Sequence, residues 1–255
     1  MQTPTYQKHK DAEVAVLFIH GFMGGPNQFA DLEEAVYGVG CTCVSVLLPG
    51  HGGGVCEFVK SGVDDWQRHV QDEIDKIKRD HKKIILVGHS MGGLLALNAS
   101  LVKENPIAAV VLLSTPLKIY LLNLRSLRFK LRLLRFPKDN AVRAAYIKSN
   151  SITLSKLFFY PSLIKPVVQL YRLIRRTRKH LSDVFVPVYM FHSKNDETTA
   201  YQSAALLYEG LCNTQKTAFA LDKSWHAFYS ADERKLIQDQ LLRLVEQIGT
   251  RNELK

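Results

Sequence analysis

The sequence predicts an α/β protein in which helices flank a mostly parallel central sheet and a helical segment interrupts the pattern. Two observations support this fold class. Short, unbroken apolar runs alternate with stretches of helical periodicity, which is typical of a parallel sheet covered on both faces. One segment, 117–182, contains no such strand-like run and is strongly basic. We therefore expect a core built from residues 1–116 and 183–255, with residues 117–182 as an inserted helical cap.

Six apolar runs have the length and composition of buried strands. They cover Glu13–His20, Thr42–Leu48, Lys83–Val87, Ile107–Ser114, Val186–His192 and Gln215–Leu221. Helical periodicity is expected over residues 27–38, 64–81, 91–104, 200–211 and 231–248. The first strand is not followed by the Gly-x-Gly-x-x-Gly pattern of a dinucleotide site, and the sequence has no phosphate-loop lysine pattern. A nucleotide cofactor is therefore not expected.

The stretch from Ile84 to Gly93 combines a buried strand, a sharp turn on Ser90 and the start of a helix, and residues 88–92 read Gly-x-Ser-x-Gly. Gly88 and Gly92 are expected because a side chain at either position would collide with a neighbouring strand or helix in so tight a turn. The turn places the serine hydroxyl at a helix N-terminus, where developing negative charge is favoured. Ser90 is the predicted nucleophile.

A serine hydroxyl needs a base to remove its proton, and the base is best oriented by a carboxylate. On a sheet of this type the acid and then the histidine follow the serine along the chain, each after a core strand. Three histidines follow Ser90, namely His180, His192 and His226. Only His226 lies in the loop between the last strand and the last helix, so His226 is the predicted base.

The acid is expected in the loop after the strand that ends at His192. Two carboxylates, Asp196 and Glu197, occupy that loop. Asp196 comes first, in a polar turn, and is the predicted triad acid. Asp222, in the loop after the final strand, is the alternative.

A tetrahedral intermediate needs two main-chain N–H donors aimed at its oxyanion. One is expected from Met91, directly after the serine. The other is expected from Phe22, in the Gly-rich turn after the first strand, where Gly21 lets the backbone come close. His20 precedes the serine in the chain and is expected to brace this turn rather than act as a base. His51 and His89 are expected to be packed or turn histidines.

Several motifs together resemble the α/β-hydrolase superfamily and are similar to the small bacterial carboxylesterases and monoacylglycerol lipases. They are His20-Gly21-Phe22, Pro49-Gly50-His51-Gly52, Ser61-Gly62-Val63-Asp64-Asp65-Trp66, Gly88-His89-Ser90-Met91-Gly92-Gly93 and the loops of Asp196 and His226. The resemblance implies the α/β-hydrolase fold with a cap that shapes the acyl pocket. It also implies hydrolysis of a small-molecule or lipid ester through an acyl-enzyme, with Ser90, Asp196 and His226 as the triad and no metal or organic cofactor.

The cap differs in charge from the remainder of the chain. Between Leu117 and His180 it holds 16 of the 34 Lys and Arg residues and a single acidic residue. Two basic amphipathic helices are expected, over 121–136 and 166–179, with an aromatic stretch, 157–161, between them. In the first helix the apolar face is expected to consist of Leu124, Leu127, Leu131 and Leu134. Three roles are possible for the basic faces: they are simply exposed to solvent, they contact an anionic membrane, or they attract an acidic substrate.

Other classes of protein fit the composition less well. No apolar run approaches the length of a membrane span, and residues 1–10 are polar, so a cytoplasmic location is expected, either free or peripheral at a membrane. The four cysteines have no metal-ligand spacing. No known nucleic-acid module accompanies the charge, so nucleic acid is not an expected partner. The alternatives to a carboxylesterase or lipase are a thioesterase or lactonase on the same triad, and a non-catalytic protein that binds membranes or a partner through the cap.

Overall fold

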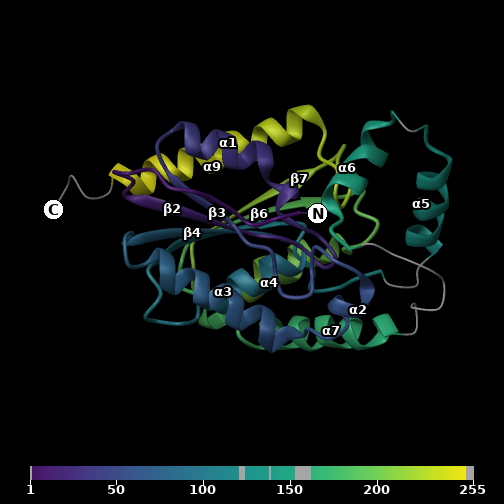
Figure 1. Ribbon diagram of the computed structural model, residues 1–255, viewed down its shortest axis with the longest axis horizontal. Helices are drawn as coiled ribbons and strands as arrows, with labels where there is room; N and C mark the ends of the chain where they lie inside the picture. Colours follow the sequence, from purple (N-terminus) through teal and green to yellow (C-terminus); the bar gives the residue numbers. More distant parts are fainter. Residues whose placement is uncertain (1, 121–123, 138, 153–161, 251–255) are drawn as a thin grey trace.

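The computed structural model describes residues 2–120, 124–137, 139–152 and 162–250. Seven strands of the described chain form one sheet through the middle of the molecule, with helices on both faces (Figure 1). The strands are β1 (Thr5–Gln7), β2 (Val14–Ile19), β3 (Thr42–Ser45), β4 (Lys83–His89), β5 (Ile107–Leu113), β6 (Val188–Ser193) and β7 (Lys216–Leu221). Their order in the sheet is β1-β3-β2-β4-β5-β6-β7, and every neighbouring pair is parallel except β1 with β3. The prediction of a mostly parallel sheet flanked by helices is confirmed.

The two faces of the sheet bury alternate residues of the same strands, as the pleat requires. In β2, Ala15, Leu17 and Ile19 belong to one apolar cluster, whereas Val16 and Phe18 belong to the other. All six side chains of β2 are buried. The unbroken apolar run of β2 therefore reflects a strand that is covered on both sides, whereas the edge strand β7 fully buries Leu221 alone.

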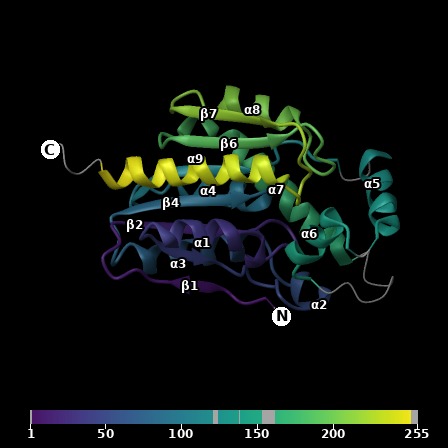
Figure 2. The same ribbon diagram turned by 90° about the horizontal axis from the view of Figure 1, so that it is seen from above.

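Figure 1 shows which helices cover each face. The helices α1 (Ala30–Gly38) and α9 (Ala231–Thr250) lie over one face, and α3 (Val63–Ile77), α4 (Met91–Ala99) and α7 (Ile164–Lys179) lie under the other. Two further helices, α2 (Val55–Phe58) and α8 (Gln202–Gly210), complete the described core. Figure 2, seen from above, shows α9 over the sheet, running along the direction of the strands, and α8 beside the edge of the sheet at β7. No helix of the described residues is long and apolar enough to cross a membrane.

The segment between β5 and β6 contributes three described helices, α5 (Leu124–Arg135), α6 (Ala141–Ser149) and α7. In both views α5 and α6 lie together at one end of the sheet (Figures 1 and 2). In contrast, α7 packs beneath the sheet on α3 and α4, where Leu170, Leu173 and Ile174 are buried in the core. We propose that the insertion ends before α7 and that this helix belongs to the core.

The predicted apolar face of the first insertion helix needs one correction. Leu131 is 51% exposed, whereas Phe129 is buried at 5%. The ring of Phe129 lies 4.6 Å from that of Trp225 and 5.1 Å from that of Tyr146. The aromatic neighbours, rather than the leucine spacing, therefore determine how α5 is turned. The side chains of Leu124, Leu127 and Leu134 and the predicted aromatic stretch 157–161 lie outside the described residues.

Candidate active site

The strand β4 ends in a turn on Ser90 that leads directly into α4. Ser90 has φ 53° and ψ −118°, a conformation that L-residues rarely adopt and that exposes a nucleophile at the top of a sheet. Its N–H donates to the carbonyl of Leu113 in β5 at 2.8 Å, which anchors the turn. A Cβ atom at Gly88 would collide with the backbone of the next helix, and one at Gly92 would collide with the carbonyl of Ile19. The tight turn therefore requires both glycines.

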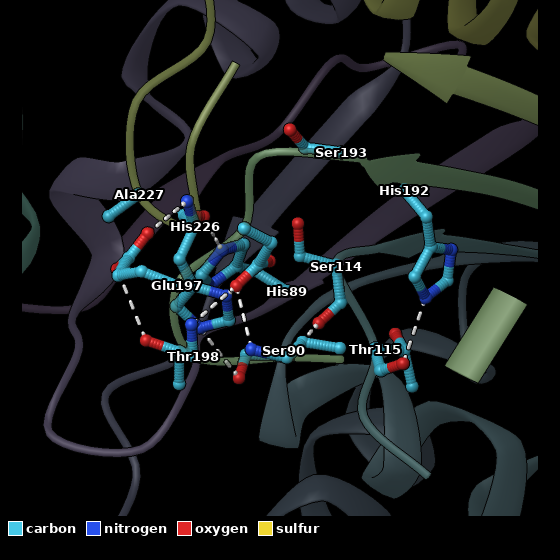
Figure 3. A network of polar contacts seen from close by, with 12 residues as sticks. His89, Ser90, Ser114, Thr115, His192, Ser193, Glu197, Thr198, His226 and Ala227 are labelled. Carbon is cyan, nitrogen blue, oxygen red and sulfur yellow. Dashed lines mark hydrogen bonds and ion pairs between the residues drawn. The ribbon is translucent and has the colours of Figure 1, made fainter. Parts of the chain in front are cut away.

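Three predicted residues from distant parts of the chain meet at this turn. The Oγ of Ser90 lies 3.1 Å from Nε2 of His226 (Figure 3). On the other side of the ring, Nδ1 of His226 lies 2.8 Å from Oδ2 of Asp196. Asp196 is buried, and its second oxygen accepts the main-chain N–H groups of Thr198 at 2.8 Å and Thr199 at 2.6 Å. The carboxylate is thus fixed in the orientation that holds the imidazole toward the serine.

The charges of this acid and histidine support each other. Burial alone would raise the pKa of Asp196, but the charge of His226 and the hydrogen bonds that the carboxylate accepts hold it below its usual value. Burial likewise opposes the charge on His226, but Asp196, and after it Glu197, keep the pKa of the imidazole above its usual value. The site therefore stabilises the imidazolium that forms when His226 takes a proton.

His89 supports the base from behind. Its ring lies 4.9 Å from that of His226, and its Nε2–H donates to the main-chain carbonyl of His226 at 2.8 Å (Figure 3). Burial, reinforced by the charge of His226, lowers the pKa of His89 to about 3. A neutral His89 can hold the loop without repelling the imidazolium.

His20 and His51 pack below the first turn, as expected. Nε2 of His20 accepts the main-chain N–H of Leu48 at 3.0 Å, and Nδ1–H donates to the carbonyl of Gly21 at 2.9 Å. Burial holds the pKa of His20 well below its usual value and lowers that of His51 to about 4. These neutral rings brace the turn that carries Phe22.

The Gly-rich turn after β2 approaches the serine closely. A Cβ atom at Gly21 would lie 3.0 Å from Nδ1 of His89 and 3.1 Å from Cβ of Ser90, so this turn runs directly against the predicted nucleophile. Among the described residues, neither the N–H of Phe22 nor that of Met91 donates to an acceptor. No described residue therefore occupies these two main-chain donors beside Ser90.

The other candidates from the sequence bond to other groups than the serine. The carboxylate of Asp222 is exposed and pairs with Lys194 at 2.6 Å. His192 donates Nε2–H to the carbonyl of Thr115 at 2.9 Å, and His180 faces Asp183 at the surface. The structure therefore brings only His226 of the three histidines to the predicted nucleophile.

Two residues at the site were not assigned a role from the sequence. Glu197 is buried, and its carboxylate faces the main chain of His226 and the hydroxyl of Tyr146 in α6. The sequence did give one indication for Glu197, because this residue directly follows the predicted triad acid Asp196. Nothing in the sequence indicated Tyr146, because α6 reaches the site only through the fold.

A cavity of about 360 Å³ lies beside the His226 loop, lined in part by His89, Tyr229 and Arg234. Ser90 does not line it, so the cavity is not assigned to the acyl group of a substrate. In the described part of the chain, no group of three or more His, Cys, Asp or Glu side chains is arranged to hold a metal ion.

Comparisons with known proteins identify relatives of this chain. A family model described as serine aminopeptidase, S33, matches residues 10–233. A thermostable monoacylglycerol lipase from Bacillus sp. (strain H-257) is 25% identical over 234 residues, which cover 91% of this chain and 90% of the relative. A carboxylesterase from Bacillus subtilis (strain 168) is 23% identical over 247 residues, 96% of this chain and 98% of the relative. The crystal structure of a monoacylglycerol lipase from Paleococcus ferrophilus superposes with a TM-score of 0.72 at 18% identity, covering 96% of this chain and 99% of that one.

Proposed function

The chain belongs to the serine aminopeptidase S33 family of α/β-hydrolases, and from this premise we propose that it hydrolyses carboxylic esters through an acyl-enzyme. The resemblance predicted from the sequence motifs is confirmed by the family match. The geometry of the site supports this proposal more specifically than the fold does. A serine Oγ, an imidazole and a buried carboxylate stand in line, with separations of 3.1 Å and 2.8 Å. The relatives named as a monoacylglycerol lipase and a carboxylesterase favour esters as the substrates.

In the acylation step, Ser90 Oγ attacks the ester carbonyl while Nε2 of His226 takes the hydroxyl proton. Asp196 holds Nδ1–H of the imidazole and stabilises the positive charge that forms there. The oxyanion of the tetrahedral intermediate accepts the N–H groups of Phe22 and Met91. When the C–O bond breaks, His226 returns the proton to the departing alcohol.

Deacylation repeats the same roles with water as the nucleophile. His226 takes a proton from the water that attacks the acyl-enzyme and then returns it to Ser90 as the acid product leaves. This chemistry requires a positioned base and two oxyanion donors, all of which the chain supplies from its own residues.

Hydrolysis of p-nitrophenyl esters across acyl lengths tests the proposal. Ser90→Ala is expected to lower kcat by at least about 10³-fold, because the nucleophile of a triad acts as part of a unit. Ser100→Ala, at the other end of α4, is the matched control and should retain the wild-type rate. A fluorophosphonate should label the wild type and the control but not the Ser90 variant.

The family description names an aminopeptidase, so the assay includes amino-acid p-nitroanilides, and also acyl thioesters and lactones. Turnover confined to one of these classes would replace the ester assignment while keeping the triad. A folded protein that neither turns over any acyl substrate nor reacts with the fluorophosphonate would overturn the proposal of a serine hydrolase.

We further propose that the outward face of α7 makes peripheral contact with anionic lipid, from which an ester substrate would be drawn. Four exposed arginines lie on this helix, namely Arg172, Arg175, Arg176 and Arg178. Exposed apolar side chains accompany them, with Ile164 at 65%, Val168 at 44% and Tyr171 at 43%. Basic helices with such apolar residues bind in the headgroup region of anionic membranes. Cosedimentation with phosphatidylserine vesicles tests this contact.

A further inference from the structure

We propose that Glu197 and Tyr146 form a positioning pair that ties the helical insertion to the general base, by holding the main chain of His226 and placing a second negative charge beside its ring. The inference rests on the proposed function, because it concerns how His226 serves as the base. It assigns a role to the only acid of the β6–α8 loop that the triad leaves unused.

The carboxylate of Glu197 points at the backbone of the loop rather than at the ring. Oε2 accepts the N–H of His226 at 3.1 Å, and Oε1 accepts the hydroxyl of Thr198 at 3.1 Å (Figure 3). Oε1 also accepts the hydroxyl of Tyr146 at 2.5 Å. All three partners are donors, which stabilises a carboxylate that carries its negative charge. The Tyr146 oxygen in turn accepts the N–H of Ala227 at 3.4 Å. The pair therefore holds two consecutive amides of the loop that carries the base.

The burial of Glu197 indicates that this arrangement has a use. Glu197 and its neighbour Asp196 are each 3% exposed. Removing two adjacent carboxylates from water is costly unless each is fully hydrogen-bonded. A neutral glutamine could accept the same amide hydrogen bond without that cost. The feature that only glutamate supplies is its charge, close to the imidazole of His226.

The same insertion helix also contacts the turn that carries Phe22. Beyond the end of α6, the N–H of Ser151 donates to the carbonyl of Met23 at 3.0 Å, and Asn150 forms a β-bridge with Gly24. At its middle, α6 presents Tyr146 to the base loop. One helix of the insertion thus braces the loop of the proposed base and the turn of a proposed oxyanion donor.

Aromatic packing reinforces the polar link. Trp225, which directly precedes His226, packs on Phe129 of α5 with their rings 4.6 Å apart, and the ring of Phe129 lies 5.1 Å from that of Tyr146. The insertion therefore contacts the base loop through one hydroxyl and one ring cluster. A shift of α6 would therefore move the main chain of His226.

The charge of Glu197 predicts a direction for the pH dependence of activity. The titratable and charged groups that face His226 are Asp196 and Glu197 from one loop, His89 and His192 from strand ends and Tyr146 from α6, with Tyr229 and Arg234 behind His89. Both carboxylates favour the imidazolium and raise the pKa of His226 against the effect of burial. A base must be neutral to accept a proton, so a higher pKa places the acid limb of kcat/KM at higher pH.

Glu197→Gln is the direct test, because it removes the charge while it keeps one of the two acceptor oxygens and nearly the same shape. We expect the acid limb of the kcat/KM profile for a p-nitrophenyl ester to move to lower pH, since His226 would stay neutral further into acid. The matched control is Glu73→Gln. Glu73 is also buried and also accepts a tyrosine hydroxyl, that of Tyr6 at 2.8 Å, but it joins α3 to β1. Its variant should lose stability and leave the acid limb in place.

Tyr146→Phe tests the other half of the pair. Loss of one hydrogen bond to a buried carboxylate is expected to lower kcat about tenfold, with a smaller change in KM, because the base loop loses its anchor. Tyr208→Phe, on an exposed tyrosine of α8, should leave both constants unchanged.

A readout without turnover separates this inference from the proposed function. The imidazole pKa of His226 can be followed by NMR in Ser90→Ala and in Ser90→Ala/Glu197→Gln. A lower pKa in the double variant supports the pair, even if no ester proves to be a substrate. An unchanged or higher pKa of His226 overturns it, as does a Tyr146→Phe enzyme with wild-type kcat.

Discussion

The helices α5 and α7 have the same sequence signature but occupy different places in the molecule. Both are basic and amphipathic, and both arise from the segment between β5 and β6. The apolar side of α7 is buried on α3 and α4, where Leu173 is 0% exposed. By contrast, α5 lies at the end of the sheet, with Leu131 half exposed and Phe129 as its buried contact with the base loop.

The comparison teaches that periodicity identifies a helix but not its partner. The partner of α7 is set by the sheet, whose lower face must be covered to keep its apolar side chains from water. A polar contact adds to this. Asn98 of α4 donates to the hydroxyl of Thr177 at 2.7 Å, deep between the two helices. For α5, the contact with Trp225 depends on a loop about a hundred residues further along the chain, which no local pattern reveals.

The largest effect is expected from removing a core contact of α7. Leu173→Ala should lower the free energy of unfolding by about 3 kcal/mol, because it creates a cavity between α7 and α4. Urea denaturation measures this change, and kcat of the folded variant should remain near the wild-type value. Val168→Ala on the exposed side of the same helix is the control, with an expected change below about 0.5 kcal/mol. If Leu173→Ala matched this control, α7 would belong with the insertion rather than with the core.

A smaller loss of stability is expected from α5, together with a loss of activity. Phe129→Leu keeps the apolar volume but removes two ring contacts, which together contribute about 2 kcal/mol. Because Trp225 adjoins His226, kcat on a p-nitrophenyl ester should fall along with stability. Leu131→Ala, two residues further along the helix on its exposed side, should change neither. Full activity in Phe129→Leu would show that α5 does not support the base loop.

The core of the fold was predictable because its signals are local. Each apolar run expected as a strand, such as Ile107–Ser114, corresponds to a strand of the sheet, here β5. The ends of helices and the edge strands of the sheet were less predictable. The three-residue strand β1 has no apolar signal and depends on pairing with β3. The helix α4 ends at Ala99 rather than near residue 104, because Nδ2 of Asn105 folds back and donates to the Ala99 carbonyl.

In the candidate site, too, some residues were predictable from local sequence signals and others were not. Ser90, Asp196 and His226 could be proposed from their order along the chain, since each follows a core strand whose position is itself readable. The supporting contacts come from packing between distant segments. Glu197 could be seen as a second acid but not as a partner of Tyr146, 51 positions earlier, because that contact exists only once α6 is placed over the loop.

The smallest expected effect is on lipid binding and comes from replacing single arginines of α5 and α7. If the outward face of α7 contacts anionic lipid, Arg175→Gln should weaken binding to phosphatidylserine vesicles about fivefold, since one basic residue near such a surface contributes about 1 kcal/mol. The loss should fade at high salt, where the surface charge is screened. Arg132→Gln on α5 should have less effect, because among the described side chains of α5 only Leu131 is an exposed large apolar residue. Arg243→Gln on α9, across the sheet from α7, removes the same charge and should change nothing (Figure 1). Equal losses in all three variants would indicate attraction by net charge alone and would remove α7 as a defined lipid-binding face.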